Sequence, residues 1–163
     1  MKALRVLVIC FCVFCITTVC FAKEYPLSKV TQDKLISVGR MGIQLSGELS
    51  SPTQKHETEM PYETKLNVNI ITDKLLLIDS YMMGINLMLK IESLHHSAGQ
   101  DNAEAIKIIK DYVEAALSQV RGEKDFISSL TKELQGLPDE QKDSIMLFYN
   151  DAEDILGRAL GEL

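Results

Sequence analysis

The sequence predicts an all-α protein that folds as an antiparallel up-down-up-down four-helix bundle with a long central helical hairpin. Along four segments, apolar residues recur at alternating steps of three and four, which places them on one face of a helix. Strand patterns, in which apolar and polar residues alternate, are nearly absent. Connections of a few to about ten residues favour antiparallel neighbours in such a bundle.

The stretch 66–94 is the most apolar part of the chain after the first 22 residues, and it is the predicted centre of the bundle. It lacks Pro and has one Gly, and we expect its helix to run from Pro61 to about His95. Its other faces are also apolar, so the helix should be buried on several sides or paired with another copy. Lys74, Asp79 and Lys90 interrupt any window of about 20 residues, which disfavours a membrane span. The residues expected on its inner face are Ile71, Leu75, Ile78, Met82, Ile85 and Leu89.

A shorter helix is expected before it, from Ser28 to Ser50. Ser50-Ser51-Pro52 is interpreted as its end, and Pro52–Pro61 as a loop. Its three glycines either let a neighbouring helix approach closely or are merely tolerated in a helix that they weaken. They are Gly39, Gly42 and Gly47.

The third helix is expected to open at Asp101, with Glu104 completing a capping box, and to close at Gly136. Within its apolar register only Glu123 is polar, and a local kink beside Gly122 is expected to tip this carboxylate into solvent. The alternative is a buried carboxylate with a partner. The register comprises Ile106, Ile109, Val113, Ala116, Val120, Glu123, Ile127, Leu130 and Leu134.

The fourth helix is expected to begin with Pro138 in its first turn. One face of it carries Ile145, Phe148, Tyr149, Ala152, Ile155, Leu156, Ala159 and Leu160. We also expect the central helix to pack against the third helix, with alanine at Leu75 or Ile78 destabilising and alanine at Lys74 nearly neutral. The facing set is Leu75, Ile78, Met82 and Ile85 against Ile109, Val113, Ala116 and Val120.

Residues 1–22 resemble a secretory signal peptide, which leaves 23–163 as a single helical-bundle domain. Lys2 and Arg5 precede an apolar run, and Ala22 suits cleavage before Lys23; lipidation of Cys20 is the alternative. The expected location is extracytoplasmic, either periplasmic or secreted. All four cysteines lie in this segment, so the remaining domain would be held by its core alone.

The domain is acidic, with 15 Lys and Arg left of the chain's 17 against 23 Asp and Glu, a net charge of −8. No basic cluster is present, which disfavours nucleic acid or an anionic membrane surface as a partner.

Patterns that carry chemistry are sparse. Glu92-Ser93-Leu94-His95 has the Glu-x-x-His form of di-iron bundles, but that site needs two such motifs. Glu92, His95 and His96 are therefore the only metal candidates, and a helix-end role for the histidines is favoured. Methionine could ligate haem but more often fills a core. No catalytic residue and no cofactor are predicted; the methionines considered are Met41, Met82, Met83, Met88 and Met146.

The predicted function is non-enzymatic, in protein–protein interaction or as a structural or accessory subunit. Helix one is short and contains glycines, so some of Leu76, Met83 and Leu87 should remain exposed and form a binding patch. The partner would be another protein or a second copy of the chain. The alternative is a carrier that holds a small ligand, a haem or a metal within the bundle.

Overall fold

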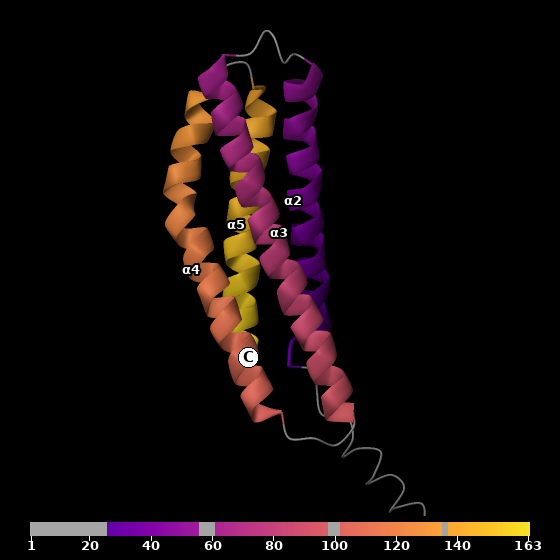
Figure 1. The fold of residues 1–163 in the computed structure, drawn as a ribbon. Helices are drawn as coiled ribbons and strands as arrows, with labels where there is room; N and C mark the ends of the chain where they lie inside the picture. The colour runs from indigo at the N-terminus through magenta and orange to yellow at the C-terminus, as the bar shows by residue number, and fades with distance from the viewer. Residues whose placement is uncertain (1–25, 56–60, 98–101, 135–136) are drawn as a thin grey trace, which may run out of the picture.

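The computed structural model describes residues 26–55, 61–97, 102–134 and 137–163, and these form four helices. They are α2 (Lys29–Lys55), α3 (Tyr62–Ser97), α4 (Ala103–Glu133) and α5 (Asp139–Glu162), shown in Figure 1. The predicted signal peptide, residues 1–22, lies outside the described residues.

The helices form an up-down four-helix bundle, which confirms the predicted fold class. Helix α2 contacts α3 and α5, and α4 also contacts α3 and α5, so the helices follow one another around a ring. Successive helices run in opposite directions (Figure 1). The central hairpin is the longer one, with 36 and 31 residues in α3 and α4 against 27 and 24 in α2 and α5. It therefore extends past α2 and α5 at the end that carries the α3–α4 connection (Figure 1).

Helix α2 begins after Ser28, whose hydroxyl accepts a hydrogen bond from the Thr31 amide at 3.3 Å. This is the usual arrangement of a serine N-cap. A carboxylate from α5 completes this N-terminus of α2. Glu162 accepts hydrogen bonds from the Ser28 amide at 2.7 Å and from the Thr31 hydroxyl at 2.6 Å. In a capping box a glutamate of the same helix accepts the cap's amide. Here α5 supplies that carboxylate, which joins the end of α5 to the start of α2.

The predicted end of this first helix was wrong. Helix α2 continues through Pro52 to Lys55. A proline's φ is already close to the helical value, so the chain can stay helical there, although a proline inside a helix removes one hydrogen bond and crowds the carbonyl of the preceding turn. The rest of the predicted loop, residues 56–60, lies outside the described residues.

The other helix starts fall within about a residue of their predicted positions. The Pro61 carbonyl accepts from the Lys65 amide at 3.1 Å, which places Pro61 directly before α3. The N-cap of α4 is Asn102, one residue beyond the predicted Asp101, and no side chain caps the helix there. The helix ends at Glu133 with Leu134 as its C-cap, two residues before the predicted Gly136. Asp101 and Gly136 themselves lie outside the described residues. Pro138 is the N-cap of α5.

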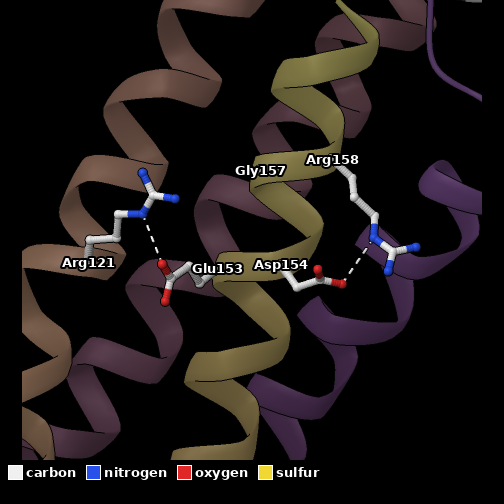
Figure 2. A pocket seen from close by; sticks show the side chains of 5 residues that line it. All are labelled: Arg121, Glu153, Asp154, Gly157 and Arg158. Carbon is white, nitrogen blue, oxygen red and sulfur yellow. Dashed lines mark hydrogen bonds and ion pairs between the residues drawn. The ribbon is translucent and has the colours of Figure 1, made fainter.

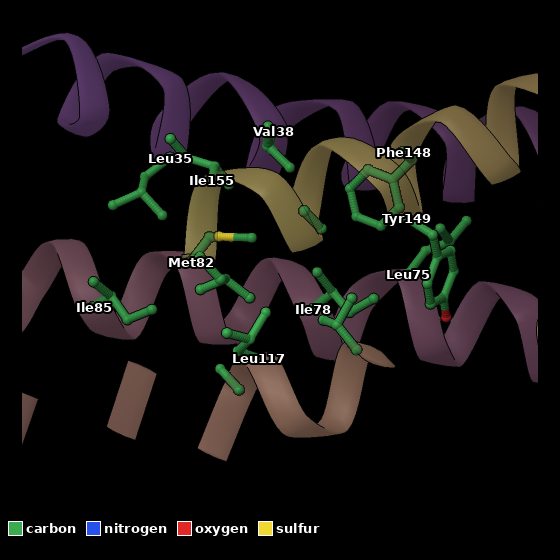
Figure 3. Close-up of a cluster of buried hydrophobic side chains, with 14 of the residues drawn as sticks. Leu35, Val38, Leu75, Ile78, Met82, Ile85, Leu117, Phe148, Tyr149 and Ile155 are labelled. Atoms are coloured by element: carbon green, nitrogen blue, oxygen red, sulfur yellow. The ribbon is translucent and has the colours of Figure 1, made fainter. Parts of the chain in front are cut away.

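The core lies along the axis of the ring, and the predicted inner face of α3 is confirmed. Its six predicted residues are at most 1% exposed. Figure 3 shows Leu75, Ile78, Met82 and Ile85 among side chains from the other helices, including Phe148 and Ile155 of α5. The predicted α4 register is also buried, except that Ile106 and Leu130 are only partly covered.

Two of the three α2 glycines stand where helices approach closely. A Cβ at Gly42 would lie 3.0 Å from the Phe148 ring and 3.2 Å from the Leu75 carbonyl oxygen, and a Cβ at Gly39 would lie 2.9 Å from Asp79 Oδ1. A Cβ at Gly47 would meet nothing within 4 Å. Close approach therefore explains Gly39 and Gly42, and Gly47 is merely tolerated.

Asp79 on α3 is held at this α2 contact and is 7% exposed. Burial raises the pKa of its carboxyl group above the ordinary value, because the charged form loses water contacts.

None of the helices in the described part of the chain combines the length and hydropathy that a bilayer crossing requires.

Candidate functional site

A buried polar cluster joins α3, α4 and α5. The Glu123 side chain, only 11% exposed, accepts hydrogen bonds on Oε1 from Lys74 Nζ of α3 and from Gln119 Nε2 of its own helix. Glu123 Oε2 and the Tyr149 hydroxyl of α5 are buried without a hydrogen-bond partner among the described residues. Burial and the neighbouring Glu123 charge raise the pKa of Tyr149 above its ordinary value.

The expectation that Glu123 tips into solvent was therefore wrong. Helix α4 is continuous through Gly122, and Glu123 stays buried because Lys74 neutralises its charge. The expectation that Lys74 is dispensable must be revised as well, because Lys74 is the counter-ion. Lys74 keeps 31% of its side chain exposed, so the pair lies at the rim of the core. We assign the cluster a structural role, that of fixing how α3 and α4 align.

The predicted metal candidates do not converge. Glu92 is buried, and its Oε1 and backbone oxygen both accept hydrogen bonds from the Asn102 side chain, at 3.3 and 3.1 Å. His95 is exposed, and the side chain of His96 lies outside the described residues. Glu92 thus ties the end of α3 to the start of α4. Within the described ranges, no three His, Cys, Asp or Glu side chains are grouped as a metal site requires.

The methionines considered as haem ligands occupy three different environments. Met82 is 1% exposed within the apolar core, whereas Met83 is 62% exposed on the surface. Met41, Met88 and Met146 are partly buried.

A shallow surface hollow between α4 and α5 is lined by charged groups (Figure 2). Glu153 accepts from Arg121 Nε at 2.9 Å and from Lys124 Nζ at 2.8 Å, which holds the pKa of its carboxyl below the ordinary value. Arg158 pairs with Asp154 at 3.1 Å on the opposite side of α5 from Arg121 (Figure 2). Both guanidinium groups are already paired with carboxylates and they do not converge on one point. The hollow therefore provides contacts between helices, and no anion site is built there.

The strongest candidate is the surface of α3 that faces away from the bundle. Nine exposed residues follow one another at alternating steps of three and four, so they form a single line along the helix. We call this line the outer stripe; it consists of Leu66, Asn69, Asp73, Leu76, Ser80, Met83, Leu87, Lys90 and Leu94.

The outer stripe includes all three predicted patch residues. Leu76 is 41% exposed, Met83 62% and Leu87 60%, which confirms that these side chains remain outside the core. Ile91 and Leu94 continue the apolar surface toward the end of the hairpin. Sequence reasoning missed the charged members, Asp73 and Lys90. Reading the exposed line for its own three-four repeat, as was done for the buried line, would have found them.

The fold and surface together define a class: an all-α, up-down four-helix bundle with an apolar stripe exposed on its longest helix. No family model, no curated protein and no solved structure matches the chain.

Proposed function

We propose that this protein is a non-enzymatic helical bundle that acts by binding another polypeptide through the outer stripe of α3. The observation that carries the proposal is the exposure of Leu76, Met83 and Leu87 in one line. Single exposed apolar residues are common on soluble proteins, but several large apolar side chains on one face of one helix, here with only Ser80 between Leu76 and Met83, are typical of an interface.

The rest of α3 supports this interpretation. Its inner face is already filled by the core, so the five large apolar residues of the outer stripe are further apolar side chains that the four helices leave uncovered. Long apolar side chains at three-four spacing are the anchors that a helix offers to a partner helix.

Photo-crosslinking in the native host tests the proposal. A photoreactive residue at Met83 should give an adduct with a polypeptide of defined mass, and one at Asn150, exposed on α5, should not. The adduct should be lost when Leu87→Glu is added, because a charge in the centre of an apolar interface opposes binding. Absence of a polypeptide adduct at Met83, with the protein folded and expressed, would refute the proposal.

We also propose that the protein works outside the cytoplasm, on the strength of the charged start, apolar run and small residues of 1–22. Mass spectrometry of the protein from its native host should find an N-terminus at Lys23. A chain that retains residues 1–22, or carries a lipid on Cys20, would contradict this.

A further inference from the structure

We infer that the occupant of the outer stripe is a second copy of this chain, packed antiparallel with the twofold axis level with Tyr81 and Met82. The inference rests on the proposed function, because it names the partner for the same surface. The order of side chains along the outer stripe points to a second copy. An antiparallel copy presents the same residues in the opposite order, and the residues that then face each other are complementary in size and charge.

The pairing follows from the spacing. In an antiparallel pair of helices centred on that axis, Leu76 of one copy lies opposite Leu87 of the other, and Ser80 lies opposite Met83. The twofold axis repeats each contact, so four leucines, two methionines and two small serines meet at the centre. A small residue opposite a large one is how facing helix surfaces interdigitate.

An oppositely charged pair lies at each end of this apolar centre. One step beyond the leucines, Asp73 of one copy lies opposite Lys90 of the other, and the symmetry supplies the same pair at the far end. Both residues are exposed, and among the described residues neither side chain has a hydrogen-bond or ion-pair partner. An apolar centre with a charged rim is the usual composition of a protein interface.

Other arrangements of the same stripe lack this match. In a parallel pair in register, each residue faces its own copy, so Asp73 meets Asp73 and Lys90 meets Lys90. Sliding the antiparallel pair by one heptad, seven residues, places Lys90 opposite Ser80 between apolar layers, where the lysine has no counter-charge. Only the first register joins the leucines and pairs both charges.

A charge-swap experiment tests the register. Sedimentation velocity over a range of concentrations should show the wild-type protein, as recovered from its host, in a monomer–dimer equilibrium. Asp73→Lys and Lys90→Asp should each weaken dimerisation by about tenfold or more, because two attractive pairs become repulsive. An equimolar mixture of these two variants should form a heterodimer at wild-type strength, since all four charges are again opposite. The controls are Asp33→Lys and Lys34→Asp, which make the same changes on the exposed surface of α2.

The outcomes separate the inference from the proposed function. A wild-type monomer at every concentration, or a dimer that the single variants leave intact, overturns the inference. A failure of the mixed variants to associate places Lys90 opposite some other residue and overturns it too. If crosslinking at Met83 nevertheless gives a specific adduct with a different protein, the proposed function stands while the second copy is excluded. If Met83 gives no polypeptide adduct at all, both fail.

Discussion

Replacing Lys74 with methionine removes the counter-ion of the buried Glu123 carboxylate and keeps most of the side-chain volume. Breaking a fully buried ion pair by removing one partner costs about 3–5 kcal/mol of unfolding free energy. The Glu123 side chain is 11% exposed and that of Lys74 is 31% exposed, so water screens part of the uncompensated charge. We therefore expect Lys74→Met to destabilise the bundle by about 1.5–3 kcal/mol at neutral pH, and the matched exposed change Lys110→Met by less than about 0.5 kcal/mol.

Urea denaturation followed by circular dichroism at the helical band measures both effects. The double variant Lys74→Met, Glu123→Leu should recover most of the loss, because an apolar pair leaves no buried charge. The reasoning would be refuted if Lys74→Met matched Lys110→Met, or if the double variant were no more stable than Lys74→Met alone.

Three further predictions concern the core, and each is measured by urea denaturation. Gly42→Ala should destabilise by about 1–3 kcal/mol because its Cβ meets Phe148 and the Leu75 carbonyl, whereas Gly47→Ala should stabilise by about 0.5–1 kcal/mol; equal effects would contradict the close approach. Leu75→Ala should cost about 2–5 kcal/mol, and a smaller loss would mean that the site is not packed as described. The pKa of Asp79 is raised in the folded state, so the folded protein binds this proton more tightly than the unfolded chain does. The contribution of Asp79 to stability therefore falls as the pH rises from its pKa in the unfolded chain, about 3.9, through its higher pKa in the folded protein. Wild type minus Asp79→Asn should show this fall across that window, and a flat difference would exclude it.

The inner face of α3 was predictable because burial on a helix follows a local repeat that single residues rarely disturb. Glu123 was not, because its partner Lys74 is 49 residues away in the sequence and the charge pair appears only once α3 and α4 are aligned. The glycines of α2 illustrate the same limit: Gly42 and Gly47 belong to one predicted helix, and the Phe148 ring and the Leu75 carbonyl beside Gly42 distinguish them.

Part of the candidate site was likewise predicted from the sequence, and part was not. The exposure of Leu76, Met83 and Leu87 could be predicted because a helix in a ring of four keeps one side uncovered. The place of Asp73 and Lys90 on the same line follows from the same three-four repeat, carried one step beyond Leu76 and Leu87, but it was missed because the prediction considered only the apolar members of that line.

The carboxylate of Glu162 also has a consequence for the order in which the protein folds. A ribosome delivers α2 well before residue 162, so the amide of Ser28 lacks this acceptor while α2, α3 and α4 are already made. Local pairing of neighbouring helices forms quickly, whereas the contact between Ser28 and Glu162 spans 134 residues and closes the ring last. Until then α2 has one lateral neighbour, α3, and the side of its helix that α5 will cover is open to water. A chain paused shortly before residue 162 should therefore be protected from proteolysis in α3, which already has both of its neighbours, while α2 and α4 are still cleaved.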